Sequence, residues 1–346
     1  MSLDRYRNMM ASGSNFFQSG RYGETGRSRL AVNISGGSMQ YQVEADWHLL
    51  NTCNYRCDYC FFSDEFLSAK LSAVASSEEW TRSFDKSGLT WLLHLTGGEP
   101  SLYPDFAGLC ASLTKRHFIS VNSNMTNSDW KRFARQVDPS RVSFVNAGLH
   151  FEERQRKSGN TAYLEHVALL RNAGFQVYCS LVGAPRALAR FEAAVELLGS
   201  IGMFPIPKLM RGTFGGRRYP DAYTHEERVM FGEFAERARA FYAPALAQRS
   251  ERPTLDMFGD DRFLDGEPSY HGLSCEAGRL FVRIDPLGEL FRCGTSTSLG
   301  NIRAGSFARS NSASPCDTSY CFYFCQKYSV ASVERRERAN LFEMRE

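Results

Sequence analysis

The sequence lacks the features that mark several classes of protein. Its 346 residues contain no apolar run that approaches the roughly 20 residues of a membrane-spanning helix. The first 45 residues show no apolar core of a secretory signal. An excess of charge is also missing, because 41 basic and 38 acidic residues leave a net charge of only +3, without the basic stripe typical of nucleic-acid binding. We therefore expect a cytoplasmic protein with neither a membrane nor a nucleic-acid partner.

Apolar residues are plentiful and follow an alternating pattern of strands and helices. Hydrophobic residues make up 43% of the chain, enough for sizeable cores, and the length suggests about two domains. From residue 46 onward, short apolar runs alternate with stretches of helical spacing. The predicted strands are Asp46–Leu50, Trp91–Leu95, Phe118–Asn122, Val142–Ala147, Phe175–Val182 and Pro205–Leu209. The predicted helices are Ser77–Lys86, Phe106–Lys115, Ser128–Val137, Ala162–Asn172 and Leu188–Gly199.

Strand-then-helix units imply parallel strands joined by right-handed crossovers. Six strands are short of the eight that close a full barrel, so the predicted class is α/β with a partial (β/α)6, TIM-like barrel. Leu30–Ile34 and Tyr41–Trp47 predict a hairpin before it. A capping box at Thr224 opens a later helix, and Pro244 is interpreted as the start of a linker. The expected units are an arm and hairpin (1–45), the barrel (46–235), a helix and linker (236–269) and a second domain (270–346).

Three of the ten cysteines follow the first predicted strand in one short loop. Cys53, Cys57 and Cys60 are spaced C-x3-C-x2-C. Iron–sulfur clusters are held by cysteine thiolates, and an ordinary four-iron cluster takes four of them. A loop with three thiols leaves one iron open to a small molecule, much as a catalytic zinc keeps an open position. A zinc on three thiols, or a chance grouping, is the alternative, although the spacing is not the paired C-x2-C.

A second motif, L-T-G-G-E-P, ends the second predicted strand at Leu95–Pro100. Gly97 and Gly98 would let a ligand approach backbone amides closely, and Glu99 adds an acceptor for an ammonium group. Alone, this motif is typical of a plain turn. Together with the cysteine loop, it resembles the radical S-adenosylmethionine (SAM) enzymes.

This resemblance covers about two thirds of the chain and implies both cofactors and chemistry. In that family the three cysteines hold a [4Fe–4S] cluster, whose open iron binds the amino and carboxylate groups of SAM, while the G-G-E-P stretch binds the methionine part. Family members use a partial (β/α)6 barrel with ligands at the C-terminal ends of the strands, where both motifs fall here. SAM cleavage then gives a 5′-deoxyadenosyl radical, which takes a hydrogen atom from the substrate.

A second group of cysteines lies in the C-terminal region, at Cys275, Cys293, Cys316, Cys321 and Cys325. A strand at Arg279–Ile284, a turn and a returning strand at Glu289–Arg292 predict a hairpin that brings Cys275 and Cys293 together. The pattern resembles the auxiliary-cluster domain of radical SAM enzymes, called SPASM in its long form and twitch in its short form. It implies a small α+β domain with one auxiliary [4Fe–4S] cluster, held by these two cysteines and two of the last three. A structural zinc on four thiolates is the alternative.

Four further residues are assigned by their places in the family pattern. Tyr59 stands where the family has an aromatic contact to the adenine. Ser123 and Asn124 resemble the turn after the third strand, and Ser180 lies where relatives carry a residue near the SAM ribose. Each of them is equally explained as a strand-end polar residue bonded to backbone.

The candidate substrate contacts are His150, after the fourth predicted strand, and Lys208 and Arg211, after the sixth. A lone histidine is more often a structural hydrogen-bonder. The glycine-rich residues 212–219 predict a loop over the barrel mouth. Cys179 is the candidate hydrogen-atom donor, although the favoured interpretation is a small buried hydrophobe. If the next residue, Ser180, faces the barrel, Cys179 should face the helices.

The combined prediction is a radical SAM oxidoreductase or epimerase that acts on a small polar substrate of the sugar or aminoglycoside type. Dehydrogenation would send an electron to the auxiliary cluster, and epimerisation would need a thiol to return a hydrogen atom; we expect the former. A small substrate is favoured because the N-terminal arm is too short for a leader-binding domain. An external electron donor such as flavodoxin or ferredoxin is the expected partner. The alternatives are a ribosomal-peptide or sulfatase maturase and a non-enzymatic metal-binding or electron-transfer protein.

Overall fold

The central feature of the fold is a twisted sheet that is parallel through its barrel portion. The computed structural model describes residues 39–60, 62–69, 75–157, 159–247, 257–264, 269–293 and 297–316. The barrel strands, each parallel to the next, are β1 (Val43–Leu50), β2 (Trp91–Gly97), β3 (Phe118–Ser123), β4 (Val142–Gly148), β5 (Val177–Val182) and β6 (Pro205–Lys208). The α/β class and the six predicted strands are therefore confirmed.

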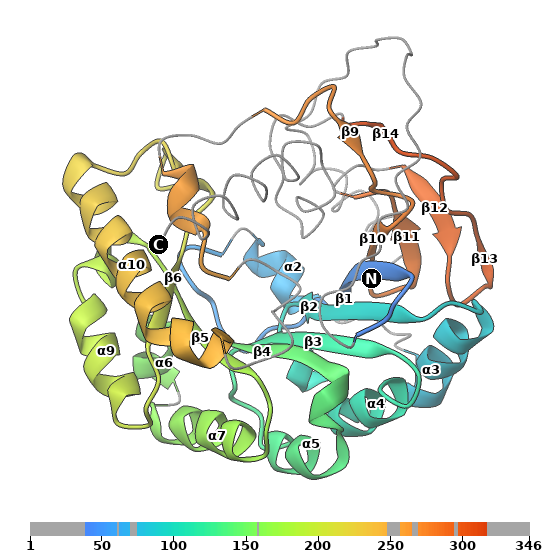
Figure 1. The fold of residues 1–346 in the computed structure, drawn as a ribbon, viewed down its shortest axis with the longest axis horizontal. Helices are drawn as coiled ribbons and strands as arrows, with labels where there is room; N and C mark the ends of the chain where they lie inside the picture. The colour runs from blue at the N-terminus through green and yellow to red at the C-terminus, as the bar shows by residue number, and fades with distance from the viewer. Residues whose placement is uncertain are drawn as a thin grey trace.

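Helices cover the outer side of this curved sheet (Figure 1). They are α3 (Ser77–Lys86), α4 (Phe106–Leu113), α5 (Trp130–Gln136), α6 (Phe151–Lys157), α7 (Thr161–Asn172), α8 (Pro185–Leu188), α9 (Phe191–Gly199) and α10 (His225–Ala247). Short segments are α2 (Asp64–Ser68), η1 (Pro100–Leu102), η2 (Pro139–Arg141) and η3 (Asp260–Phe263). The last predicted barrel helix starts at Phe191 rather than Leu188, because Pro185 begins a separate helical turn before it.

Alternation along β1 divides its side chains between two environments. Trp47 packs edge-on against Trp80 and Phe84 of α3, with ring centroids 4.8 and 5.0 Å away. Full burial of an apolar side chain of this kind contributes about 1.5–3 kcal/mol. The alternate residues Glu44 and His48 lie on the opposite face, and both are also buried. Helix packing therefore fixes one face of β1 and leaves a polar face toward the interior.

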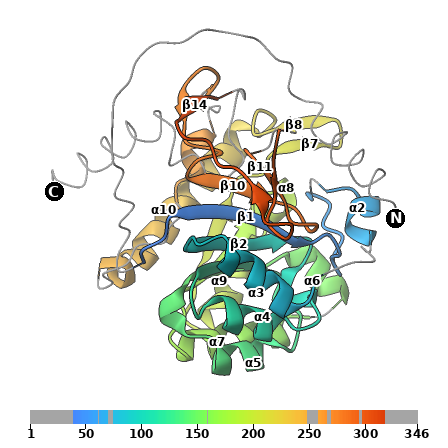
Figure 2. The same cartoon turned by 90° about the vertical axis from the view of Figure 1, so that its right-hand side faces the viewer.

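The C-terminal hairpin continues the barrel sheet instead of starting a new one. Its strands are β10 (Phe281–Ile284) and β11 (Glu289–Phe291), followed by β12 (Ser298–Asn301) and β13 (Ser306–Phe307). β10 pairs in parallel with β1, with Phe281 opposite Glu44, and antiparallel with β11. Figure 2 shows β10 and β11 beside β1 and β2. The predicted hairpin is confirmed, and its turn is held by Asp285, which accepts hydrogen bonds from the backbone of Leu287 and Glu289.

Other predictions for the connecting segments are partly corrected. The capping box is confirmed, because Thr224 and Glu227 exchange backbone and side-chain hydrogen bonds. α10 continues through Pro244, which the sequence assigned to a linker. Tyr242, two residues earlier, donates to the Phe204 carbonyl. Residues 212–219 form a hairpin of β7 (Gly212–Phe214) and β8 (Arg217–Tyr219), not an irregular loop. The predicted strand Leu30–Ile34 lies outside the described residues. Within the described ranges, none of the helices has the length and apolarity needed to cross a bilayer.

Candidate active site

The cysteine loop leaves β1 at the C-terminal end of the barrel. The Cys53 amide donates to the Leu67 carbonyl of α2, and the Cys60 amide donates to the Cys57 carbonyl, so the loop has a defined backbone. All three thiols are partly exposed. Burial, with a contribution from the neighbouring thiols, raises the pKa of Cys53 to about 11 and that of Cys57 to about 12. Thiols in this state become thiolates when a metal centre supplies positive charge.

The donor set of this loop consists of thiols, the ligand type that iron–sulfur clusters take. A four-iron cluster spreads its thiolate ligands over separate irons. Three partly exposed thiols on one loop, Cys53, Cys57 and Cys60, are therefore the residues that would hold a cluster.

Gly97 and Gly98 also have a role within the chain, in addition to the predicted contact with SAM. The Gly98 amide donates to the Leu50 carbonyl at 2.8 Å, so the chain itself uses this group. A Cβ atom at Gly98 would lie 2.2 Å from the Asn51 carbonyl oxygen and 2.3 Å from that of Thr52. Gly97 has φ +113°, in the region that favours glycine. The close approach is therefore made by the entry to the cysteine loop, and the two motifs are docked to each other through backbone.

Glu99 joins the ends of β2 and β3. Its carboxylate is buried and accepts four hydrogen bonds: from the amide and hydroxyl of Ser101 at 3.0 and 2.6 Å, from the Ser123 hydroxyl at 2.6 Å and from the Asn124 amide at 2.7 Å. Burial raises the pKa of Glu99, and these donors act against that shift. The structure thus brings together Glu99, Ser123 and Asn124, each of which the sequence analysis predicted to bind SAM. It adds Ser101 to this group.

We expect Glu99→Ala to weaken SAM binding while iron stays in the cysteine loop. The substitution leaves four donors without their acceptor, at about 1–3 kcal/mol for each buried group that water cannot reach, so the turn should loosen. Isothermal titration of SAM and iron analysis on the same preparation measure the two effects. Glu99→Gln is the matched control, because it keeps one carbonyl acceptor. Unchanged SAM affinity in Glu99→Ala would contradict the assignment.

Arg154 is a central residue that the sequence analysis missed. It is buried in α6 and donates to the carbonyls of Asn124 at 2.5 Å and Leu149 at 3.2 Å, which connects the ends of β3 and β4. Its guanidinium lies 4.2 Å from the Tyr163 ring centroid and 5.7 Å from that of Tyr55. The helix was not predicted because its sequence, F-E-E-R-Q-R-K, lacks apolar residues at helical spacing.

Tyr59 and His150 lie together against the cysteine loop. The Tyr59 hydroxyl is 2.9 Å from His150 Nδ1, and the Cys57 sulfur is 3.5 Å from the same atom. His150 has φ +34°, and its ring occupies the space that a Cβ at Gly148 would need. Loss of water contact, with the nearby Arg154 charge, lowers the pKa of His150 to about 4. His150 is therefore neutral near pH 7 and borders the predicted cluster ligands.

Ser180 and Cys179 point to opposite sides of β5, as the alternation required. Ser180 is buried and lies in register with Gly148 of β4. Cys179 is fully buried and hydrogen-bonded to Tyr163 of α7, so it faces the helices. Burial raises the pKa of the Cys179 thiol to about 12. These surroundings favour the packing interpretation of Cys179.

Lys208 is the last residue of β6, and Arg211 follows it by three positions. The Lys208 ammonium is 2.7 Å from Asp260, whose other oxygen accepts from the Leu209 amide. Although burial opposes ionisation of Asp260, the charges of Lys208 and Arg211 hold its pKa below the usual value. Arg211 also lies over the Phe263 ring, 5.2 Å from its centroid. Both cations therefore hold the segment around η3 against the barrel.

The second cysteine group is also drawn together. Cys275, Cys293 and Cys316 are buried in one cluster with Phe281. β9 (Ser274–Cys275) pairs with β14 (Ser314–Pro315), and the Cys316 amide donates to the Leu273 carbonyl at 2.8 Å. The predicted ligands Cys321 and Cys325 lie outside the described residues. Three of the five predicted thiols are therefore near each other.

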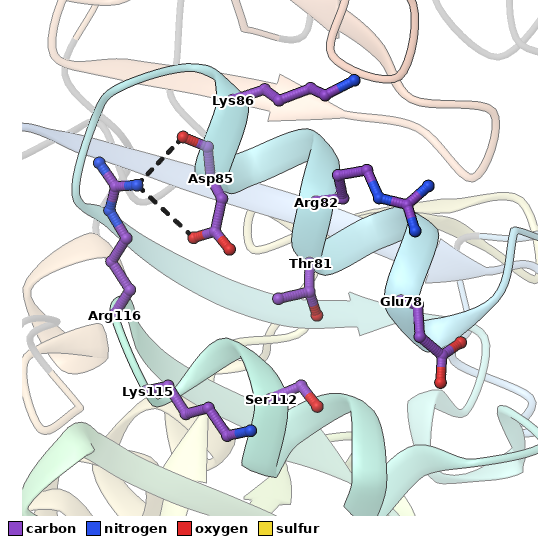
Figure 3. Close-up of a pocket in the computed structure, with 8 residues that line it drawn as sticks. All are labelled: Glu78, Thr81, Arg82, Asp85, Lys86, Ser112, Lys115 and Arg116. Atoms are coloured by element: carbon purple, nitrogen blue, oxygen red, sulfur yellow. Dashed lines mark hydrogen bonds and ion pairs between the residues drawn. The ribbon is translucent and has the colours of Figure 1, made fainter.

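Two surface depressions involve neither motif. One encloses about 460 Å³ between α3 and α4 (Figure 3). There Arg116 donates to the Asp85 carbonyl at 3.1 Å. The neighbouring one, of about 520 Å³, includes Thr90 and Phe118, where β2 and β3 begin. Neither depression is a candidate for the active site, because the motif residues lie where the strands end.

Known proteins share the sequence pattern of this chain. The family model of the Radical SAM superfamily matches residues 47–198. An S-adenosylmethionine-dependent nucleotide dehydratase from Thermoplasmatales archaeon (strain ISO4-H5) is 32% identical over 142 residues, which cover 39% of this chain and 49% of that protein. The chain thus matches about half the length of this curated relative.

Solved structures show the same fold at low sequence identity. Streptococcus suis SuiB bound to S-adenosylmethionine has a TM-score of 0.51 and 14% identity, over 76% of this chain and 64% of that one. Histidine-tagged anSMEcpe with bound AdoMet has a TM-score of 0.51 and 13% identity, over 77% of this chain and 76% of that one. With the cysteine loop docked on the G-G-E-P turn at the barrel end, residues 47–198 are thus similar to the Radical SAM superfamily in sequence, and the described chain shares the fold of these solved structures.

Proposed function

We propose that this protein cleaves SAM and removes a hydrogen atom from a small polar substrate of the sugar or aminoglycoside type, giving dehydrogenation or epimerisation. The bound [4Fe–4S] cluster and SAM would supply the hydrogen-abstracting 5′-deoxyadenosyl radical. One observation carries the proposal: Gly98 and Glu99 dock the three-cysteine loop onto the ends of β2 and β3. A fixed loop of three thiols at a barrel end is what positioning of such a cofactor pair requires.

The chain's own residues supply binding and orientation. Cys53, Cys57 and Cys60 would hold the cluster, and the turn at Gly97, Gly98 and Glu99 would face the methionine part of SAM. Asn124 connects this turn to the loop, because its side chain donates to Asn54 at 2.8 Å. Tyr59 would contact the adenine, while Ser123 and Ser180 border the same end of the barrel. His150, Lys208 and Arg211 stay candidate substrate contacts.

The second cysteine group would complete the redox path. Cys275, Cys293 and Cys316 lie in one cluster, and a fourth ligand would come from Cys321 or Cys325. An auxiliary [4Fe–4S] cluster there would accept the electron that the substrate radical loses, with a proton, when it becomes the oxidised product. An external donor such as flavodoxin or ferredoxin in the cytoplasm would reduce the first cluster. Oxidation is therefore favoured over epimerisation.

Anaerobic purification and reconstitution test this proposal. We expect about seven to eight irons per chain from two four-iron clusters, with labile sulfide, and 5′-deoxyadenosine after reduction in the presence of SAM. Zinc without labile sulfide, or iron without SAM cleavage, would overturn it.

A nucleotide is the second candidate substrate, because the 32% identical relative is named a nucleotide dehydratase. In the test, nucleoside triphosphates and monosaccharides are added separately to the reduced enzyme with SAM, and 5′-deoxyadenosine formation is measured. Stimulation of 5′-deoxyadenosine formation only by a nucleotide, with loss of water from that nucleotide, would replace the sugar assignment.

Cys179→Ala separates the hydrogen-donor hypothesis from packing. We expect the variant to keep its product and to lose about 1–2 kcal/mol of stability for a small cavity, because Cys179 faces α7. Thermal unfolding and product analysis in D₂O measure both effects. Loss of an epimerised product, together with solvent deuterium at the reacting carbon in the native enzyme, would instead identify Cys179 as the donor.

A further inference from the structure

The three thiols of the cysteine loop differ in the groups that hydrogen-bond to their sulfur atoms. The Tyr55 amide donates to the Cys53 sulfur at 3.4 Å. The Phe62 amide is hydrogen-bonded to the Cys60 sulfur in the same way. Both donors are backbone groups that lie two residues further along the chain. Cys57 is the exception, because side chains provide its partners.

Two side chains meet at the Cys57 sulfur. His150 Nδ1 lies 3.5 Å from this sulfur, and the Tyr59 hydroxyl is hydrogen-bonded to it. The same hydroxyl is 2.9 Å from His150 Nδ1, so the sulfur, oxygen and nitrogen atoms form a triangle. Tyr59 belongs to the cysteine loop, whereas His150 follows β4 and is 93 residues away from Cys57 in the sequence. The contact therefore depends on the barrel, which brings the two segments together.

His150 is held in this position from several sides. Its backbone has φ +34°, and its carbonyl accepts a hydrogen bond from the Arg154 amide of α6 at 2.9 Å. The Tyr59 ring stacks on the imidazole, with 6.1 Å between centroids and 20° between planes, and the Tyr55 ring meets it edge-on at 6.0 Å. On another side, Gly148 leaves so little room that an added Cβ would lie 2.5 Å from Nε2. The imidazole is therefore oriented before any cofactor binds.

The chemistry of a thiolate selects where the protons of this group lie. When Cys57 binds a metal centre, its sulfur is a thiolate, which can only accept hydrogen bonds. A neutral imidazole carries one proton, and a lone pair of Nδ1 against the negative sulfur would be repelled, so Nδ1 carries the proton. His150 then donates either to the sulfur itself or to the Tyr59 oxygen, whose own proton goes to the sulfur. In both arrangements the Cys57 ligand accepts a hydrogen bond from this pair.

Hydrogen bonds to ligand sulfurs are among the factors that set the reduction potential of an iron–sulfur cluster. Reduction adds negative charge, and the thiolate ligands carry part of it. An N–H or O–H dipole aimed at a sulfur therefore stabilises the reduced state more than the oxidised state, which raises the potential. The amide donors at Cys53 and Cys60 belong to the backbone, so side-chain replacement does not remove them. The donors at Cys57 are side chains and depend on the residue type.

We propose that Tyr59 and His150 are positioning residues that supply a hydrogen bond to the Cys57 ligand and thereby raise the reduction potential of the predicted SAM-binding cluster. This inference rests on the proposed function and deepens it, because the proposed reaction starts with an electron from an external donor. It assigns Nδ1 of His150 to the cysteine loop and leaves Nε2 for the predicted substrate contact. The Tyr59 hydroxyl is engaged in the same way, so the predicted adenine contact would use its ring.

A redox titration of the reconstituted holoenzyme, followed by electron paramagnetic resonance, tests this inference. His150→Phe and Tyr59→Phe each keep an aromatic ring and remove a donor. We expect native iron content and a lower midpoint potential of the first cluster, with the ratio of reduced to oxidised cluster about tenfold smaller at a fixed potential, or 59 mV for one electron. The first cluster is recognised because SAM changes its signal, and the second cluster should keep its potential. His150→Asn keeps a side-chain N–H donor and tolerates positive φ, so it should restore the native value.

Tyr242→Phe is the matched control, because it loses a hydroxyl that donates to the Phe204 carbonyl at 2.7 Å and not to a cysteine sulfur. Both potentials should stay native in this variant. An unchanged or raised potential in either test variant, or an equal shift of both clusters, would overturn the inference. If His150→Phe loses its iron, Tyr59→Phe decides, and a native potential there overturns the inference. SAM cleavage with unshifted potentials would refute this inference alone, and shifted potentials without SAM cleavage would refute the proposed function alone.

Discussion

Replacing Cys53, Cys57 and Cys60 together by Ala is expected to abolish SAM cleavage and to leave about four irons per chain at the second cysteine group. The physical reason is that the two groups have separate ligand sets. The first three thiols occupy one loop after β1, whereas Cys275, Cys293 and Cys316 share a cluster around Phe281. Loss of the loop thiols removes the ligands of one cluster and none of the other.

Iron and sulfide analysis, electron paramagnetic resonance and 5′-deoxyadenosine formation measure this result. Cys110→Ala is the matched control, because Cys110 is a fully buried cysteine of α4 outside both groups. It should lose about 1–2 kcal/mol of stability and keep both clusters. Loss of all iron in the triple variant would show that the two sites are not independent.

Gly98→Val should remove iron from the cysteine loop as well as SAM binding. The added side chain would begin 2.2 Å from the Asn51 carbonyl oxygen, so backbone at the entry to the loop has to move. Overpacking of this kind costs about 1–3 kcal/mol or more, and here it separates the two motifs. Iron content should fall from about eight to about four per chain, and SAM cleavage should be lost.

Gly232→Ala is the control for this substitution. Nothing lies within 4 Å of a Cβ at Gly232 in α10, so alanine should be tolerated or should stabilise the helix by about 0.4–1 kcal/mol. Full iron content in Gly98→Val, with only SAM affinity reduced, would mean that the turn faces SAM without supporting the loop.

The sequence predicted the barrel because buried parallel strands produce continuous apolar runs separated by helical periodicity. It also predicted both cysteine groups, since thiol spacing is local information. The shared hydrogen bonds of Glu99, Ser123 and Asn124 were not foreseeable, because strand neighbours in space are distant in sequence. Their individual assignment from position still selected residues that the fold brings together.

The surroundings of charged residues were the hardest feature to predict from the sequence. Arg154 lies in a charged run that the sequence analysis assigned to no element, and its guanidinium lies over the rings of Tyr55 and Tyr163. Lys208 was expected to contact substrate, and Asp260 from a later segment pairs with it. Arg283 belongs to a hairpin strand, and it becomes an interior residue because β10 pairs with β1. Each outcome depends on a partner that no local pattern shows.

The pairing of β10 with β1 also constrains how the chain assembles. β1 is the first of the six barrel strands in the sequence, and its second neighbour in the sheet is β10, with Glu44 opposite Phe281. One edge of β1 is therefore covered only after the C-terminal hairpin has been synthesised. Until then, β1 presents a row of unpaired amides and carbonyls, which is a template for association with other chains. Contacts of such long sequence separation slow folding and prolong this exposure. The hairpin that carries Cys275 and Cys293 thus also protects the edge of β1 from pairing with other chains. Removal of this hairpin should favour aggregation.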